Sequence, residues 1–193
     1  SLYPEDEENM IGVPSPTLIV TIPNGGEVCG VGAEKKIQWS CTGTFSSFTI
    51  QISRNGGASW NIIETGLRGD YWYRDWTVTG PGSSSCRIKV IGYYSGGLTS
   101  DISDENFTIG QLTLTSPNGG EKWEAGSTHE ITWTSSGVSG GIKIQPYLHG
   151  DAQDNVYPSA PDTGSYTWTV PLDYTIAVSY THLRAHETSL HLV

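Results

Sequence analysis

The sequence predicts an all-β protein made of two tandem immunoglobulin-like β-sandwich domains, the second truncated. Three observations predict this: a unit that occurs twice, short stretches that alternate between apolar and polar residues, and a composition rich in turn-forming residues. The 193 residues include 24 Gly and 10 Pro, and only 16% are charged. Gly, Pro, Ser and Thr favour turns and strands over helices. An ordinary α/β enzyme is therefore not expected.

The repeat begins at the segment Pro23–Glu27 (PNGGE), which recurs as Pro117–Glu121. At the same spacing Trp39 falls on Trp133, and after a two-residue slip Trp76 falls on Trp168. Self-similarity of this kind is the sequence signature of tandem modules. We expect a complete first copy over residues 17–110 and a second copy over 111–177. The second copy is expected to be incomplete because nothing in it matches residues 86–109 of the first.

Each copy is expected to be built of short strands between turns. In the first copy, Leu18–Ile22 precedes a turn at Asn24-Gly25-Gly26, where Asn and Gly tolerate positive φ. The next strand, Lys35–Cys41, alternates with Ile37, Trp39 and Cys41 facing inward. The remaining expected strands are 48–53, 60–65, 73–78, 87–93 and 106–109. So many short strands in one unit indicate two packed sheets.

A hairpin with a defined turn is expected between the third and fourth strands. Ser53–Trp60 (SRNGGASW) resembles the Asp-box hairpin, with Asn55 in the place of the Asp and Ser59 in the place of the Thr. A short polar side chain there caps the turn, and Trp60 packs over it. We interpret this segment as a fold element, with glycan contact as the alternative.

The repeated motif also carries a family resemblance. PNGGE-x-W-x-x-G-x-x-x-x-I-x-W-x-x-x-G, then I-x-I and Y-x-W-T-V, stands at Pro117–Gly137, Ile142–Ile144 and Tyr166–Val170. It resembles the serine/threonine-rich, cell-wall-associated module family (KRE/KNH-like) named after fungal β-glucan assembly proteins. The resemblance covers residues 17–177. It implies immunoglobulin-like sandwiches, often repeated, in extracellular or cell-surface multidomain proteins, and it brings no catalytic residues. The first copy departs from the motif because Cys29 stands where the second has Trp123.

Both ends of the chain are expected to lie outside the modules. Residues 1–16 contain four acidic residues and no Lys or Arg, which is typical of a disordered acidic linker. The tail 178–193 begins VSYTHLRAHET and resembles the translation of a widely used transposase library adapter. We therefore expect this tail to be non-native and the chain to be a fragment of a larger protein. On that basis His182, His186 and His191 are not expected to bind a metal.

The charge of the chain excludes two classes of partner. The formal net charge is −10 and the pI is about 4.7, which argues against nucleic acids and anionic membranes. No apolar run approaches the roughly 20 residues of a membrane span, so no membrane insertion is expected. A cell-wall polysaccharide or surface glycan is the expected partner.

The best binding candidate is the aromatic run Tyr71–Trp76. Trp76 matches Trp168 and is expected in the core, whereas Trp72 has no counterpart in the second copy. Trp72 with Tyr93 and Tyr94 could form an exposed platform on which sugar rings stack. The alternative is that Trp72 simply packs within its loop.

The three cysteines, Cys29, Cys41 and Cys86, all lie in the first copy. An extracellular chain favours one disulfide and one odd thiol. An immunoglobulin-like layout slightly favours Cys29–Cys86 over Cys41–Cys86, and three buried reduced thiols are the alternative. A catalytic Cys is not expected, because His129 and His149 belong to the other copy.

Two groups of acidic and amide side chains are candidates for calcium ligands or for a hydrolytic pair. They are Asp101, Asp104 and Glu105 in the first copy, and Asp151, Asp154 and Asn155 in the second. Neither has EF-hand spacing, and neither signals two carboxylates across a cleft. Solvated turn residues are expected, with calcium as the alternative and no other cofactor.

These observations predict a non-catalytic extracellular module that acts as a spacer or as a cell-wall or polysaccharide attachment unit of a larger secreted protein. One alternative is the accessory region of a secreted hydrolase whose catalytic domain lies outside this sequence. Another is a protein–protein adhesion array.

Overall fold

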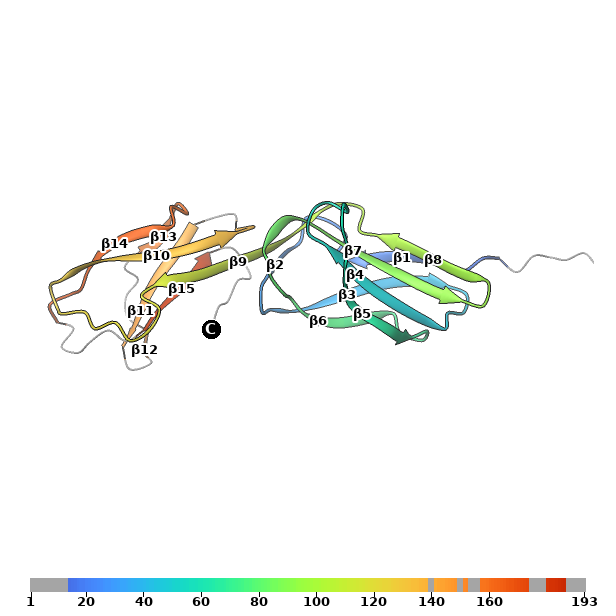
Figure 1. Ribbon diagram of the computed structural model, residues 1–193, viewed down its shortest axis with the longest axis horizontal. Helices are drawn as coiled ribbons and strands as arrows, with labels where there is room; N and C mark the ends of the chain where they lie inside the picture. The colour runs from blue at the N-terminus through green and yellow to red at the C-terminus, as the bar shows by residue number, and fades with distance from the viewer. Residues whose placement is uncertain (1–13, 139–140, 149–150, 153–156, 174–179, 187–193) are drawn as a thin grey trace, which may run out of the picture.

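The computed structural model describes residues 14–138, 141–148, 151–152, 157–173 and 180–186. These residues form strands and turns and contain no helix. Figure 1 shows two β units lying end to end along the long axis of the molecule. The all-β fold with two immunoglobulin-like sandwiches, the second truncated, is confirmed.

The first unit contains β1 to β8 and the beginning of β9. The bounds are β1 Thr17–Ile22, β2 Val28–Gly30, β3 Glu34–Thr42, β4 Ser47–Ser53, β5 Asn61–Arg68, β6 Tyr73–Thr77, β7 Ser83–Tyr94, β8 Gly97–Ile102 and β9 Phe107–Ser116. One sheet has the order β1-β3-β6, and β5, β4, β7 and β8 form the facing sheet together with β9 and β2. The inward side chains of the two sheets make the core, which includes Trp39, Phe48, Ile50, Ile88 and Phe107.

The alternation predicted for the second expected strand holds only in part. Ile37 and Trp39 are buried, but Cys41 is exposed. Cys41 lies one residue before the end of β3, and the last three residues of this strand are exposed. A period-2 pattern gives the direction of a side chain and does not say where the facing sheet ends.

The predicted Asp-box-like hairpin is confirmed as a fold element. The Asn55 Oδ1 atom accepts a hydrogen bond from the Ser59 backbone N–H at 2.9 Å, and Ser53 Oγ accepts one from the Gly57 N–H at 2.8 Å. A Cβ built on Gly57 would lie 3.7 Å from the ring of Trp60, so the indole covers the turn. The side chains of Ser53, Asn55 and Ser59 are engaged within the turn, whereas Arg54 donates to the carbonyl oxygens of Thr79 and Pro81.

The PNGGE turn has the same structure in both copies. The Glu27 carboxylate accepts hydrogen bonds from the N–H groups of Asn24 and Gly25, at 2.7 and 2.8 Å. The Glu121 carboxylate accepts the equivalent bonds from Asn118 and Gly119, at 2.8 and 2.7 Å. The glutamate of the motif therefore caps the turn that follows the first strand of each copy.

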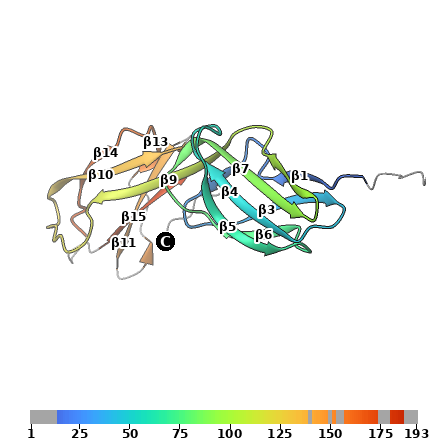
Figure 2. The ribbon, with the colours of Figure 1, turned by 45° about the vertical axis from the view of Figure 1, so that its right-hand side comes forward.

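Strand β9 belongs to both units (Figure 2). Its first residues pair with β2 and β7, and Gln111–Ser116 pair with β10. One sheet with the path β14-β10-β9-β7-β4-β5 consequently runs through both copies. The expected domain boundary between residues 110 and 111 falls inside this strand.

The second unit repeats the first sheet of the first unit. Its strands are β10 Thr128–Ser136, β11 Gly141–Leu148, β12 Asp151–Ala152, β13 Tyr157–Ala160, β14 Ser165–Thr169 and β15 Tyr180–His186. His129 lies opposite Trp168 in the β10–β14 pair, just as Lys35 lies opposite Trp76 in the β3–β6 pair. Its core contains Trp123, Ile131, Trp133, Ile142, Ile144 and Trp168.

Part of the expected non-native tail forms a strand of this unit. The backbone of β15 pairs with β11 from Gly141 to Tyr147, where β7 would pair with β4 in the first copy. His182 and His186 lie opposite Gln145 and Gly141, and His191 lies outside the described residues. The adapter origin of residues 178–193 stays a prediction. In the described residues, the second copy has no counterpart of β8 or of the first half of β9.

The junction between the units is closely packed around β9. A Cβ added to Gly137 would lie 2.2 Å from the carbonyl oxygen of Ile109, and one added to Gly82 would lie 2.4 Å from Ser136 Oγ. The Gly82 N–H donates a hydrogen bond to Gln111 Oε1 at 3.2 Å. These contacts require glycine at positions 82 and 137.

We expect Gly137→Ala to destabilise the protein by more than about 2 kcal/mol, because the new methyl group collides with backbone that is held in the shared sheet. Gly120→Ala is the matched control: both residues have positive φ, but a Cβ at Gly120 meets nothing within 4 Å. The control should lose about 1 kcal/mol, the cost of positive φ alone. Urea denaturation measures both, and equal losses would show that the junction is loosely packed.

The Glu121 turn makes stability depend on pH. Hydrogen bonds from backbone N–H groups, that of Asn118 foremost, lower the pKa of the Glu121 carboxyl. A lowered folded-state pKa gives stability that is present above the unfolded pKa and is lost as pH falls through the folded pKa. Glu121→Gln should therefore lower Tm at pH 7 and leave it unchanged at about pH 2. Glu124→Gln, at an exposed neighbour, is the control, and an equal decrease at both pH values would contradict the expectation.

Candidate binding surface

An aromatic surface lies at the edge of the β1-β3-β6 sheet where β6 begins, and we define it by Lys36, Trp72 and Tyr73. Lys36 Nζ lies 4.0 Å from the centroid of the Tyr73 ring, which is a cation–π contact. The ring of Trp72 meets that of Tyr73 edge to face, with centroids 4.8 Å apart. The Trp72 side chain is 55% exposed.

The backbone holds Trp72 at this position. Its carbonyl oxygen accepts a hydrogen bond from the Trp39 N–H at 3.1 Å, directly beside the core. Trp39 is buried and Trp72 is exposed, so the loop between β5 and β6 is fixed while its indole faces solvent. Ile19 is also exposed on this sheet, since its neighbours Leu18 and Val20 point inward. Exposed apolar groups gathered on one face mark a surface suited to a partner.

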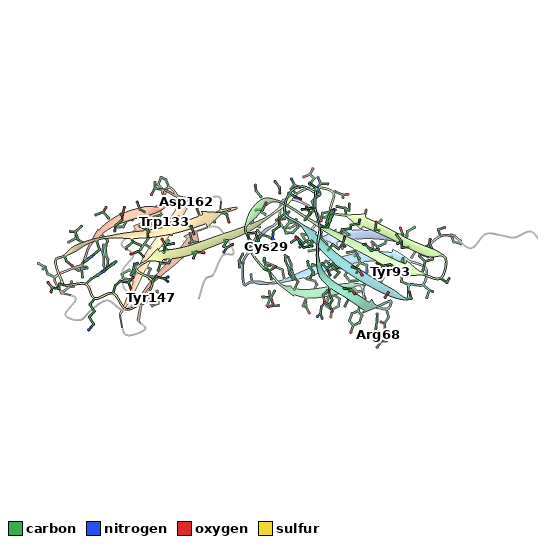
Figure 3. The ribbon with its side chains drawn as sticks, viewed as in Figure 1. Cys29, Arg68, Tyr93, Trp133, Tyr147 and Asp162 are labelled. Atoms are coloured by element: carbon green, nitrogen blue, oxygen red, sulfur yellow. The ribbon has the colours of Figure 1, made fainter. Side chains whose placement is uncertain are left out.

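The structure does not bring Trp72, Tyr93 and Tyr94 together as the predicted platform. Tyr93 lies on the other sheet, at the solvent face of β7 and opposite the exposed Leu98 (Figure 3). Tyr94 points the opposite way and meets Phe45 edge-on, with centroids 6.1 Å apart. Consecutive strand residues face opposite sides of a sheet, so two adjacent tyrosines cannot form one stacking surface.

Tyr94 instead lines a hollow at the end of the first sandwich. The hollow has a volume of about 500 Å³ and is bordered by Pro16, Gly43, Thr44 and Gly96 among others. Its Tyr94 ring is half-buried, because it packs against the core through Phe45. Tyr73 lies within the predicted aromatic run Tyr71–Trp76. Lys36 is not among the predicted binding residues, although it lies at an outward position of the predicted alternation.

The acidic residues of the first copy act as structural links. Asp101 Oδ2 accepts a hydrogen bond from the Val20 N–H at 2.8 Å, and Asp104 Oδ2 accepts one from Asn24 Nδ2 at 2.7 Å. They join the end of β8 and the following turn to β1 and the PNGGE turn. Among the described residues, no group of three His, Cys, Asp or Glu side chains could hold a metal ion. Asp154 and Asn155 lie outside the described residues.

The thiols of Cys29 and Cys86 are free and buried, which corrects the favoured disulfide. Cys29 lies on β2 and Cys86 on β7, and β9 pairs with both strands and so separates them. Strands two places apart are separated by roughly 10 Å, which exceeds the Cα distance of about 4.4–6.8 Å that a disulfide allows. Burial raises the pKa of both thiols, so they are protonated at neutral pH. The alternative of three buried thiols fails at Cys41, which is exposed.

Within the described residues, nothing forms a helix of the length and hydrophobicity that a membrane crossing requires. The chain matches no family model and no curated protein. It is similar in structure to the fibronectin(III)-like modules of Clostridium thermocellum CbhA, at 14% identity over 92% of this chain and 100% of that chain, with a TM-score of 0.36.

Two further solved structures are similar to the chain. The FN1–FN3 domains of chicken CNTN1 are 15% identical over 87% of this chain and 60% of that chain, with a TM-score of 0.30. An engineered protein is 17% identical over 49% of this chain, with a TM-score of 0.37, and the match spans only 20% of that protein. TM-scores this low carry no functional argument. The chain is a pair of immunoglobulin-like β-sandwich units on the strength of its own strand order and register.

Proposed function

We propose that this chain is a non-catalytic extracellular module that acts as a rigid spacer and attaches a larger secreted protein to cell-wall polysaccharide. The observation that carries the spacer role is the shared strand β9 (Phe107–Ser116), which is a strand of both sandwiches. Successive domains are ordinarily joined by flexible linkers. Here the hydrogen-bonded ladder itself crosses the junction, so the two units extend as one body.

The packing at the junction supports the same role. Gly137 of the second unit lies so close to Ile109 that a Cβ there would be 2.2 Å from the Ile109 carbonyl oxygen, and Gly82 of the first unit donates a hydrogen bond to Gln111. A stiff connection keeps a missing domain at a set distance from its attachment point. A flexible linker would instead let that distance fluctuate.

The attachment role rests on the aromatic surface of Lys36, Trp72 and Tyr73. An exposed indole offers a flat apolar face on which a sugar ring stacks, and the nearby ammonium group donates hydrogen bonds to hydroxyl groups. One such contact is weak. Retention on an insoluble polymer then arises from several modules that bind at once.

Two alternatives remain in different classes. In the first, the chain is the accessory region of a secreted hydrolase, and the same surface brings the missing catalytic domain to its substrate. In the second, it belongs to an adhesion array that binds proteins and not sugars. Binding to glucan or chitin by the isolated chain separates the second alternative from the other two roles.

The spacer role is tested by ¹⁵N relaxation of the whole chain. We expect one rotational correlation time for residues of both units, because the shared sheet makes them tumble together. A variant with a short Gly/Ser segment inserted between Gly110 and Gln111 is the control and should show two shorter correlation times. Two independent correlation times in the unmodified chain would exclude a rigid spacer.

The attachment role is tested by Trp72→Ala in a retention assay on insoluble glucan and chitin. We expect retention to fall at least tenfold, which corresponds to the roughly 1.4 kcal/mol that a lost stacking contact is worth. Tm should change little because the indole is exposed. Leu98→Ala, which removes an exposed apolar group from the other sheet, is the matched control and should bind normally. Unchanged retention in Trp72→Ala would end the attachment role and leave the spacer role standing.

A further inference from the structure

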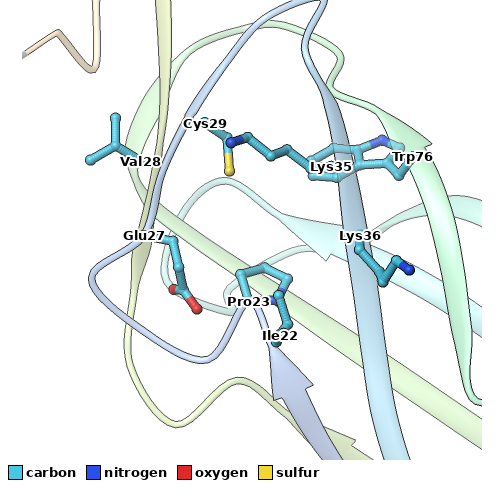
Figure 4. Close-up of a pocket in the computed structure, with 8 residues that line it drawn as sticks. All are labelled: Ile22, Pro23, Glu27, Val28, Cys29, Lys35, Lys36 and Trp76. Atoms are coloured by element: carbon cyan, nitrogen blue, oxygen red, sulfur yellow. The ribbon is translucent and has the colours of Figure 1, made fainter. Parts of the chain in front are cut away.

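The first sandwich contains a pocket that the sequence did not predict (Figure 4). It lies beyond the end of β1, beside the start of β3, and has a volume of about 190 Å³. Its lining is mainly apolar and includes Ile22, Pro23, Val28, Cys29, Lys35 and Trp76. Cys29 and Trp76 are buried, and Lys35 is half-buried.

The second copy shows what occupies the equivalent place. There the Trp123 ring stacks on His129, with centroids 4.3 Å apart and an interplanar angle of 2°. The same ring lies 6.0 Å from the ring of Trp168. In the repeat, Cys29, Lys35 and Trp76 correspond to Trp123, His129 and Trp168.

Two features of the frame are the same around both places. The Gly32 N–H donates to the Val78 carbonyl and the Gly126 N–H to the Val170 carbonyl, both at 2.8 Å. The cross-strand pairs Lys35–Trp76 and His129–Trp168 have the same register. The pocket therefore lies at the place that the Trp123 ring occupies in the second copy. In the first copy, the smaller Cys29 side chain does not fill it.

The surrounding backbone keeps the pocket from collapsing. β2 is held by its parallel pairing with β9, in which Cys29 lies opposite Ile109. The turn at the other wall is held by the two backbone bonds to the Glu27 carboxylate. Apolar cavities of about 150 Å³ in rigid proteins bind benzene-sized molecules and remain free of water. A preformed pocket of this kind is ready for a flat apolar ligand.

We propose that this pocket binds a small bicyclic aromatic molecule of the indole class, which takes the place that the Trp123 side chain has in the second copy. The ligand ring packs against Trp76, and the Lys35 ammonium lies over its face in the position of His129. Cations favour the face of an aromatic ring, and an indole ring is the strongest partner among the side chains. The pocket shares Lys36 with the aromatic surface, but it lies beyond the end of β1 and takes a different ligand, so the inference goes beyond the proposed function.

The charge of the pocket suits a neutral ligand. Burial raises the pKa of the Cys29 thiol, which therefore stays protonated and uncharged at neutral pH. The Glu27 carboxylate is engaged by the N–H groups of the turn. Lys36 also lines the pocket, but its ammonium group lies over the Tyr73 ring. The Lys35 ammonium group is the one that the face of a bound ring meets, so an anionic ring is not required.

The experiment is an NMR titration of the full chain with indole, followed in ¹H–¹⁵N spectra. We expect saturable shifts of the amides of Cys29 and Lys35 and of the Trp76 side-chain N–H, without shifts around Trp168. Cys29→Trp supplies the missing ring, so it should reduce the affinity at least tenfold and raise Tm. Lys35→Met keeps the length of the side chain without its charge and should weaken binding several-fold.

A gain-of-site variant keeps the test independent of whether Cys29→Trp folds. Trp123→Cys removes the seated ring from the second copy and should create a second indole site, reported by shifts at His129 and Trp168. The proposal is overturned if the unmodified chain shows no saturable shift at millimolar indole. It is also overturned if folded Cys29→Trp binds indole as tightly as the unmodified chain.

Discussion

The hydrogen-bonded ladder of β9 is the constraint on which the rest of the structure depends. Its first residues pair with β2 and β7, and its later residues pair with β10. The strand thereby ends one core at Ile109 and begins the next at Leu112. Any side chain that alters the path of β9 disturbs both sandwiches. The close approaches at Gly82 and Gly137 follow from this, because two units that share a strand have no spacer between them.

The two copies show how one frame accommodates different interiors. Both retain the PNGGE turn. Both also retain the pairing of β3 with β6, or of β10 with β14, and a buried tryptophan on β3 or β10. The side chains around that tryptophan differ. Trp133 Nε1 donates a hydrogen bond to Asp162 Oδ1 at 2.7 Å. The equivalent atom of the first copy, Trp39 Nε1, is buried and has no hydrogen-bond partner among the described residues. Asp70, which corresponds to Asp162, is paired with Arg68 instead.

The two copies also differ at the positions of Cys29 and Trp123, where the change in side-chain size is larger. In the first copy, the pairing of β2 with β9 holds one wall of this region, so the absence of the ring leaves a space and not a collapsed core. The edge of the same sheet carries the exposed Trp72 and its contact with Tyr73. The β1-β3-β6 sheet thus has one tryptophan, Trp72, exposed to solvent and another, Trp76, in the wall of the pocket.

The local order of residues by itself determined most strands of the first copy, the turns and the repeat, since period-2 alternation and PNGGE act over a few residues. It also predicted the Asn55 hairpin, whose hydrogen bonds lie within one turn. It did not predict β2 or β8. Only the tertiary structure decided how the pieces meet. It placed Tyr93 and Trp72 on different sheets, put β9 between Cys29 and Cys86, and left Cys41 exposed near the end of β3. These outcomes depend on which strands are neighbours and where the facing sheet ends, and residues distant in the sequence set both.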